Sequence, residues 1–489
     1  MDRRLDRRRF LGGAAASVAA LAAGRGATLV PTPAWASEAW RRQRLVVGPG
    51  TRPFPSKPEG IDTMPQIEHV VIYMQENHSF DNYFGMLGRG DGFTLDGQGK
   101  PTNSQPNSKG EQVVAFHSTD DYCQATPFSG QSWNATHREF NGGAMDGFVT
   151  ANGDDRPGSM AYWDGSDLPF YYGLASTFVL CDRWFTSAPC QTLPNRRYLQ
   201  AATSAGMITS DPQEVLAIPN VPNGCIWERF EAHGISWADY AIDLADILLF
   251  QDFYKSHANK VKRFEDFLLA AQTGTLPQVS IISPGHHVYS EEDPSDIQLG
   301  EAYSASIINA LMHGPAWEKT ALFFMYDEHG GYYDHVPPPA AIAPDSIPPN
   351  TQPGDEPGGF DWYGFRVPAM VISPYAKAGY VSHVVHDHTS VLKFLETKFN
   401  LGALTYRDAN ADDLLDCFDF NAMAFREPPE LPAPGLPASG STCSDVAPPK
   451  TRVEVPTTTT TSGPTTTVAG GGTSAPPASP VPGQAGYTG

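Results

Sequence analysis

Short runs rich in β-branched and aromatic residues alternate along the chain with segments of helical periodicity. The runs occupy residues 67–74, 177–181, 279–282, 320–326 and 367–373, and the helical segments occupy 195–205, 264–271, 300–313 and 389–399. Such runs predict strands that are buried inside a sheet. Because strands that alternate with helices form mostly parallel sheets, we expect an α/β fold whose sheet is covered on both faces.

Polar residues directly follow three of these predicted strands. Residues 76–77 come after the first run, residues 182–192 after the second, and residues 327–329 after the fourth. In mostly parallel sheets, ligands bind beyond the carboxyl ends of the strands, so we expect the functional site there. The Pro- and Gly-rich loops expected to cap this end occupy residues 85–165 and 337–359.

The strand ends supply three carboxylates and one amide, from Glu76, Asn77, Asp327 and Glu328. Taken singly, either pair is more typical of a solvated loop or a helix cap. Three acids in one cleft without a cation would have raised pKa values and destabilise the fold. The set therefore predicts one divalent metal ion, of the Ca, Mn or Zn class, because these ions accept oxygen ligands.

Thr192 lies between a predicted strand and a predicted helix, within the sequence Cys190-Gln-Thr-Leu-Pro-Asn-Arg196. A hydroxyl at this place can coordinate the metal and act as a nucleophile beside the positive end of the helix dipole, which favours phosphate. Alternatively, Thr192 caps a helix that begins near Asn195. Ser187 is a second candidate hydroxyl in the same loop.

The two ends of the chain differ in composition from its middle. Arg7-Arg-Arg-Phe-Leu11 precedes an apolar stretch that ends at Ala34-Trp-Ala36, which predicts a twin-arginine-type signal peptide over residues 1–36. An ordinary secretory signal or a membrane anchor is the alternative. We expect a lead-in at 37–60, a catalytic domain at 61–430 and a Pro/Thr/Gly-rich disordered tail at 431–489. The protein is then exported, to the periplasm, the cell wall or the medium.

The net charge narrows the expected partners, and the cysteines bear on covalent links. The formal charge of −21 opposes binding to nucleic acid. It also gives no electrostatic attraction to an anionic membrane, so contact with a membrane or cell wall has to be local. Six cysteines in an exported chain predict disulfides. No C-x-x-C spacing occurs, so we expect no cysteine metal site. The sequence leaves the oligomeric state open.

Residues 67–85, Ile-Glu-His-Val-Val-Ile-Tyr-Met-Gln-Glu-Asn-His-Ser-Phe-Asp-Asn-Tyr-Phe-Gly, resemble the opening of a bacterial phosphoesterase family. This family contains phosphatidylcholine-type phospholipases C and an acid phosphatase. Further stretches that resemble its blocks are 141–148, 192–196, 326–331 and 387–390. The resemblance implies an alkaline-phosphatase-like fold of three layers, α/β/α. It also implies that Glu76, Asn77, Thr192, Asp327 and Glu328 hold the metal and that Thr192 attacks phosphorus.

The histidines depart from the family pattern. The family often has histidine where this chain has Gln131 and Asp293, so the proton donor to the leaving oxygen is left open. His287 is the preferred substitute and His137 the second; otherwise each is a surface or structural histidine. His329 is either a further ligand or orients its loop, and His388 is either catalytic or a packing residue.

The expected reaction is phospholipase C cleavage of a phospholipid head group. The first alternative is an exported acid phosphatase that acts on small phosphomonoesters. The second is a catalytically weakened protein that only binds a phosphorylated ligand.

Overall fold

The computed structural model describes residues 46–119, 121–285, 289–435 and 443. The predicted signal peptide and almost all of the predicted tail lie outside these residues. Among the described residues, no helix combines the length and hydropathy that crossing a membrane requires.

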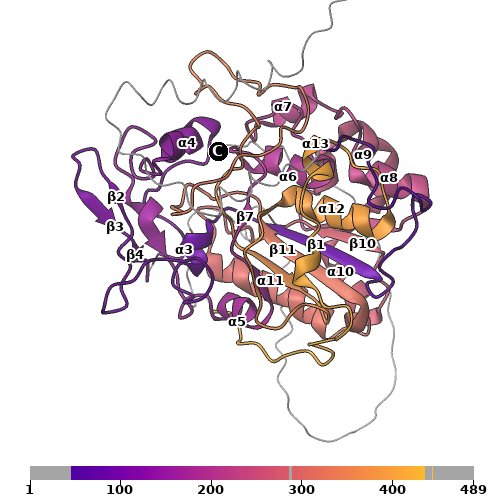
Figure 1. Cartoon of the computed structure of the whole chain (residues 1–489). Coiled ribbons are helices and arrows are strands. Elements are labelled where there is room, and N and C mark those ends of the chain that lie inside the picture. The colour runs from indigo at the N-terminus through magenta and orange to yellow at the C-terminus, as the bar shows by residue number, and fades with distance from the viewer. Residues whose placement is uncertain (1–45, 120, 286–288, 436–442, 444–489) are drawn as a thin grey trace, which may run out of the picture. The chain divides into compact units, whose positions relative to one another are not determined.

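A sheet of eight strands, counted over the described residues, forms the centre of the domain (Figure 1). Its order is β13-β6-β12-β11-β1-β10-β8-β9. Only β12 runs antiparallel to its neighbours, so the expected mostly parallel sheet is confirmed. The strands are β1 (His69–Gln75), β6 (Val179–Cys181), β8 (Trp237–Ala241), β9 (Val261–Arg263), β10 (Val279–Ile282), β11 (Thr320–Tyr326), β12 (Ala369–Ile372) and β13 (Val381–Ser382).

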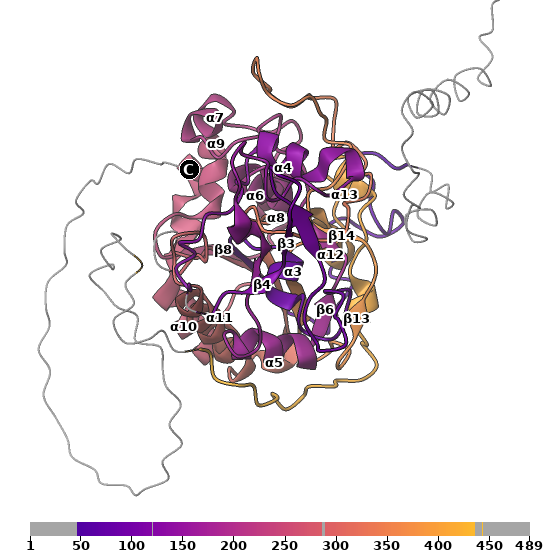
Figure 2. The same ribbon diagram turned by 90° about the vertical axis from the view of Figure 1, so that its left-hand side faces the viewer.

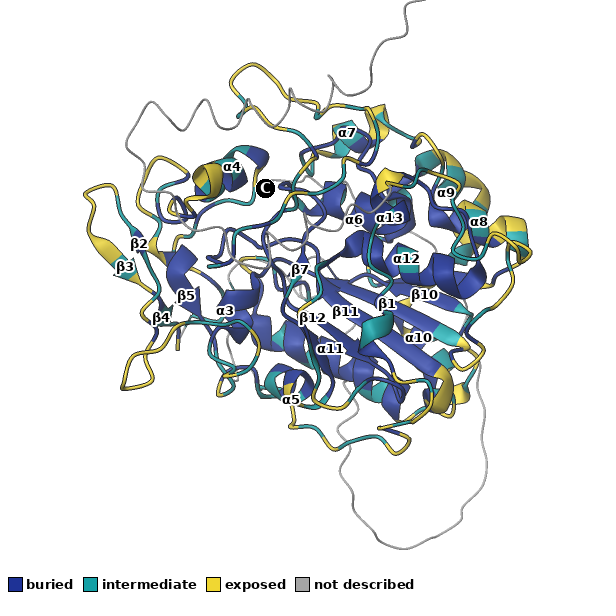
Figure 3. Cartoon of the chain, viewed as in Figure 1, coloured by how far each residue is buried: buried dark blue, intermediate teal, exposed yellow. Residues whose placement is uncertain are grey.

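The middle of the sheet is the most deeply buried part of the domain (Figure 3). Every residue of β11 is buried, and in β1 only His69 is partly exposed. This matches the β-branched and aromatic content of both segments, because a strand covered on both faces needs apolar side chains on both. All five strands expected from the sequence belong to this sheet. β8, β9 and β13 were not expected.

Helices cover both faces of the sheet, which confirms the three layers (Figure 1). On one face lie α5 (Pro169–Thr177), α10 (Phe264–Thr273) and α11 (Ile297–Met312). On the other lie α6 (Thr192–Ala201), α8 (Ile226–His233), α12 (His388–Phe399) and α13 (Tyr406–Ala409). The four helical segments expected from the sequence correspond to α6, α10, α11 and α12.

The long segment between α3 (Phe80–Phe84) and α5 lies at the end of the sheet to which β1 leads (Figures 1 and 2). Its own small apolar core includes Phe148 and Met160, which pack with Phe365. The expectation that residues 85–165 cap this end is thereby confirmed, although the segment contains short strands and a helix as well as loops. Its elements are β2 (Ser104–Pro106), β3 (Gln112–Val114), β4 (Phe116–His117), α4 (Trp133–Phe140) and β5 (Ala161–Tyr162).

The packed part of the chain extends past residue 430, where the tail was expected to begin. The amide of Gly435 donates a hydrogen bond to Oε2 of Glu301 at 2.6 Å. Cys443 forms a disulfide with Cys123, 320 residues earlier. This confirms that the chain uses its cysteines for a disulfide. The other four cysteines, all described, are buried thiols: Cys181, Cys190, Cys225 and Cys417.

Candidate active site

The two acidic pairs lie at the same edge of the sheet because β1 and β11 are adjacent and parallel. Gln75 is paired in register with Tyr326, and each of the two strands then continues directly into its polar pair. Glu76 and Asn77 follow the first strand, and Asp327 and Glu328 follow the second. The sequence placed these four side chains at two strand ends, and the structure shows that the two strands are neighbours.

Arg196 of α6 connects the two strand ends. Its Nη2 lies 3.0 Å from Oε1 of Glu76, and its Nε lies 3.2 Å from Oδ2 of Asp327. Its Nη1 reaches Asp246 at 3.3 Å. Burial alone would lower the pKa of Arg196, but Asp246, Asp327 and Glu76 together raise it. The guanidinium is therefore a fixed internal cation that holds the acids in place.

Thr192 is the first residue of α6 and lies one helical turn before Arg196. Residues four apart on a helix share a face, so Thr192 lies on the face of α6 that meets the acids. Its side chain is 7% exposed. The N-cap residue is Gln191, so Thr192 is not the cap that the sequence left as an alternative.

Asn195 and Ser187 shape the loop before α6. Asn195 accepts a hydrogen bond from the amide of Ala188 and donates one to the carbonyl of Cys190. Ser187 is buried, and its Oγ donates to Oδ2 of Asp387 at 2.7 Å. The hydroxyl of Ser187 is thus engaged away from the acids, and Thr192 is the better placed of the two candidates.

Asn77 and Glu328 carry polar atoms that their surroundings do not satisfy. Both side-chain polar atoms of Asn77 and Oε1 of Glu328 are buried without a hydrogen-bond partner among the described residues. The other oxygen of Glu328 accepts from the amide of Gly330 at 2.7 Å. Gly330 has a φ of +66°, and a Cβ there would lie 1.9 Å from the carbonyl oxygen of Asn77. Only glycine therefore allows these two strand ends to approach this closely.

The site has an excess of negative charge in spite of Arg196. Burial raises the pKa of Asp327, and the charges of Glu76, Glu328 and Glu292 raise it further. Burial likewise raises the pKa of Glu328. A divalent cation would relieve this repulsion and use the unsatisfied oxygens, so the residues present fit an ion that prefers oxygen ligands.

Comparison with known proteins identifies the family. The model of the phosphoesterase family matches residues 67–402. The chain belongs to the phosphoesterase family. Among curated relatives, "Phospholipase C B" of Mycobacterium tuberculosis is 31% identical over 434 residues, covering 76% of this chain and 81% of the relative. "Non-hemolytic phospholipase C" of Pseudomonas aeruginosa is 33% identical over 420 residues, covering 75% of this chain and 59% of the relative.

A plant protein and a solved structure are also similar to this phosphoesterase. "Non-specific phospholipase C1" of Arabidopsis thaliana is 31% identical over 379 residues, covering 70% of this chain and 69% of the relative. A crystal structure of a protein in the alkaline phosphatase superfamily from Vibrio parahaemolyticus aligns over 73% of this chain and 71% of the chain of that protein. The TM-score of the alignment is 0.36, and the sequence identity is 8%.

Of the two histidines expected to act on the leaving oxygen, His137 makes no described contact with the acids of this phosphoesterase. His137 lies on α4, where its Nδ1 donates to the carbonyl of Trp133 and its ring packs between Trp133 and Trp362. Glu139, two residues later, is the α4 side chain that reaches His329. His287 lies outside the described residues. The catalytic roles of both histidines stay predictions.

His329 and His388 position the end of β11. Nε2 of His329 lies 2.8 Å from Glu139, and its Nδ1 lies 3.3 Å from Glu328. Burial lowers the pKa of His329, but these carboxylates outweigh the effect of burial and raise the pKa to about 9. His388 donates from Nε2 to the carbonyl of Asp327 at 2.8 Å, and burial lowers its pKa to about 3. These contacts hold both rings at the end of β11, and a ligand role for His329 or a catalytic role for His388 stays a prediction.

Three contributors to the site were missed in the sequence: Arg196, Glu139 and Glu292. Nε2 of Gln131 donates to Oε1 of Glu292 at 3.1 Å. The pKa of Glu292 is raised to about 8, by burial first and then by Glu76. Glu292 lies in the segment after β10, which ends at Ile282, but too far beyond the strand end for the rule that functional groups follow strands to single it out. Arg196 lies within residues 192–196, which resemble a block of the family. A charged residue on a helix is more often exposed to solvent, so its burial was not expected.

Proposed function

We propose that this phosphoesterase is a phospholipase C that hydrolyses the head-group phosphodiester of a phospholipid, with Thr192 as its nucleophile. One observation carries the proposal: Thr192 opens α6 one turn before Arg196, whose guanidinium pairs with both Glu76 and Asp327. The hydroxyl is therefore tied to the acidic cluster by a rigid helix. The names of the relatives, which are phospholipases C, support the same reaction.

In the first step, Oγ1 of Thr192 bonds to phosphorus while the bond from phosphorus to the glycerol oxygen breaks. The Thr192 hydroxyl gives up its proton in this step, and the glycerol oxygen takes up one proton and leaves as diacylglycerol. Water then cleaves the phosphothreonine and releases the phosphorylated alcohol. The amino-terminal end of α6 favours the phosphate through its dipole.

Glu76, Asn77, Asp327 and Glu328 are the residues that would hold the divalent ion, with Thr192 beside it. When bound, such an ion polarises a phosphoryl oxygen and favours the threonine alkoxide. Arg196 keeps Glu76 and Asp327 apart and oriented, and His388 fixes the main chain at Asp327.

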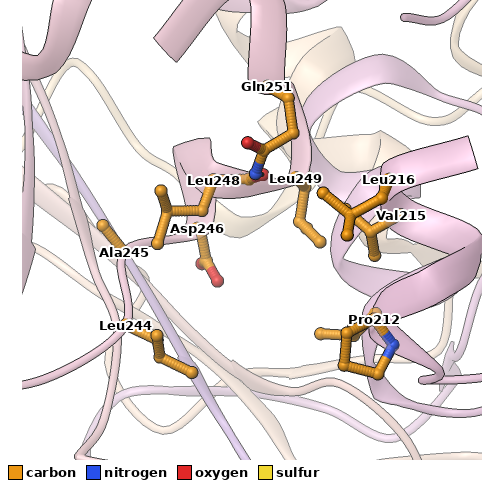
Figure 4. A pocket seen from close by; sticks show the side chains of 10 residues that line it. Pro212, Val215, Leu216, Leu244, Ala245, Asp246, Leu248, Leu249 and Gln251 are labelled. Carbon is orange, nitrogen blue, oxygen red and sulfur yellow. Dashed lines mark hydrogen bonds between the residues drawn. The ribbon is translucent and has the colours of Figure 1, made fainter. Parts of the chain in front are cut away.

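An apolar pocket beside α6 supports a lipid substrate over a small phosphomonoester (Figure 4). Its volume is about 200 Å³. Leu193, the neighbour of Thr192, lines it, as does Asp246, the partner of Arg196. In the close view, Pro212, Val215 and Leu216 face Leu244, Ala245 and Leu248 across the opening. We assign this pocket to an acyl chain of the substrate, which needs apolar contacts near the phosphate.

We also propose that the enzyme acts outside the cytoplasm. The twin-arginine-like start of the sequence supports export, and so does the Cys123–Cys443 disulfide, because disulfides persist in oxidising compartments. Sequencing the amino terminus of the protein from culture medium tests this. Cleavage after Ala36 is expected, and retention of the full-length protein in the cytoplasm would contradict it.

The reaction is tested with p-nitrophenyl phosphorylcholine and p-nitrophenyl phosphate, each with added divalent metals. The wild-type protein is expected to prefer the diester. Thr192→Val, which keeps the shape but lacks the hydroxyl, is expected to lose at least about a thousandfold of turnover, and Thr192→Ser to retain much of it. Preference for the monoester would indicate an acid phosphatase. Ligand binding without turnover in the wild type would indicate a binding protein.

A further inference from the structure

Three buried side chains that are far apart in the sequence meet at the edge of the sheet next to β13. Cys181 ends β6, His386 lies in the short strand β14 (His386–Asp387), and Cys417 lies in the 3-10 turn η6 (Leu415–Cys417). The two sulfur atoms and a ring nitrogen of His386 all lie within 4.8 Å of one another. All three side chains are at most 1% exposed.

A carboxylate completes this group. Oδ1 of Asp416 lies 3.5 Å from Sγ of Cys417 and 3.7 Å from Nε2 of His386. On the other side of the ring, Nδ1 of His386 is buried without a hydrogen-bond partner among the described residues, with Oδ1 of Asp412 at 3.5 Å. Asp416 therefore reaches two of the three donors, and Oγ of Ser382 lies between the two, donating to Oδ2 of Asp416 and lying 3.1 Å from Nε2 of His386.

We propose that Cys181, Cys417, His386 and Asp416 form a zinc site that shares no residue with the acidic cluster beside Thr192. Two thiolates, one imidazole and one carboxylate are the donors that four-coordinate zinc accepts. Ligands on a tetrahedral zinc ion at about 2.0–2.3 Å lie within about 4 Å of one another. Cys181, His386 and Cys417 already lie within 4.8 Å of one another, so small side-chain movements bring these three to that spacing, and Asp416 is the fourth ligand from the same turn as Cys417.

Two simpler roles for the paired cysteines account for less of the geometry. A buried thiol can act as a small apolar side chain, as Cys225 does, but that role does not require a histidine and a carboxylate at the sulfur. A disulfide between Cys181 and Cys417 would leave the sulfur atoms no use for the nearby imidazole and carboxylate, which would then serve only in their hydrogen bonds with Ser382. Zinc uses all four groups.

The expected role of the ion is structural. It would join the end of β6 and the segment around η6 to β14, and α12 begins immediately after β14. His388, the first residue of α12, holds the carbonyl of Asp327. Zinc at this site would therefore stabilise the frame behind the active site without contacting the substrate.

Cobalt gives a test that does not depend on activity. The mature protein is stripped of metal, reloaded with Co²⁺, and scanned in the near ultraviolet for thiolate-to-cobalt charge transfer. The acidic cluster has oxygen donors and cannot produce this band. The band is expected in the wild type and lost in Cys181→Ser and Cys417→Ser. It should remain in Cys225→Ser and in Cys190→Ser, which removes a thiol on which Glu328 acts electrostatically.

Thiol titration of the wild type decides the question even if the variants fail to fold. In denaturant without reductant, four thiols are expected, from the four free cysteines. In the native protein, two of these thiols should react with an alkylating reagent when zinc is removed and be protected when zinc is added. A count of two, with a Cys181–Cys417 peptide found by mass spectrometry, would overturn the proposal in favour of a disulfide. Four thiols with no cobalt band and no protection by zinc would also overturn it.

Discussion

Gln131 and Glu292 form a hydrogen bond, 3.1 Å from Nε2 to Oε1, at the border of the acidic cluster. The carboxylate of Glu292 acts electrostatically on both Glu76 and Glu328. In its ionised form it adds to the negative potential that attracts a cation to this site, without being among the expected ligands.

At about pH 9, above the raised pKa of Glu292, we expect Glu292→Gln to raise the metal concentration for half-maximal activity by about tenfold, because one nearby charge is lost. The amide oxygen of the replacement still accepts the bond from Gln131. Metal titration of p-nitrophenyl phosphorylcholine hydrolysis measures the change. Glu356→Gln is the control, since Glu356 pairs with Arg138 at the surface. An unchanged metal dependence would contradict this prediction.

Arg196→Gln should destabilise the protein by about 3–5 kcal/mol, because Glu76, Asp246 and Asp327 would remain buried without their cation. Urea unfolding of the metal-free protein measures the change. Arg426→Gln, which breaks a surface ion pair with Glu318, should cost less than about 1 kcal/mol. Equal losses in the two variants would show that Arg196 does not organise the cluster.

Leu216→Asp should slow cleavage of long-chain phosphatidylcholine vesicles by about tenfold, since a charge would enter the apolar pocket. Turnover of p-nitrophenyl phosphorylcholine, which has no acyl chain, should fall much less. Leu269→Asp on α10 is a matched control, because Leu269 is 59% exposed and Leu216 is 58% exposed. A similar loss with both substrates would exclude the pocket as an acyl site.

His335 predicts a fall in stability at alkaline pH. Burial lowers its pKa, but Asp81 at 2.6 Å outweighs this and raises the pKa to about 10. Because the folded-state pKa exceeds the ordinary value of about 6.5, the ion pair stabilises the fold fully below that pH. Its contribution is lost as the pH rises toward 10.

The free energy of unfolding should therefore decrease between about pH 6.5 and 10, and less steeply in His335→Gln. Urea unfolding at a series of pH values gives both slopes. His233→Gln, at a surface contact with Glu59, should keep the wild-type slope. Identical slopes in wild type and His335→Gln would assign the pH dependence to other groups.

Local patterns were sufficient to predict the central strands and the four ligands proposed for the metal. β1 and β11 are continuous apolar runs, and the polar residues that follow them stand out in the sequence. β8 was missed because its sequence, Trp-Ala-Asp-Tyr-Ala, contains a buried aspartate that breaks the apolar pattern. β13 has only two residues, too few for any periodicity.

Contacts between distant residues could not be predicted in this way. Arg196 reaches Glu76 and Asp327 from α6, and no sequence pattern predicts that a single charged residue on a helix is buried. The disulfide joins cysteines 320 residues apart. Cys181, His386 and Cys417 likewise lack the short spacing by which zinc sites are recognised, so the expectation of no cysteine site rested on a pattern that this group does not use.

The order of the sheet has a consequence for biosynthesis. Val70 of β1 pairs with Val279 of β10 and Ala321 of β11, so the first strand to leave the ribosome receives its partners late. Until then an apolar segment with two open edges is present in the growing chain, where it can pair with other chains. The centre of the domain therefore closes only when most of the chain has been made, and we expect folding to be slow and to follow translation.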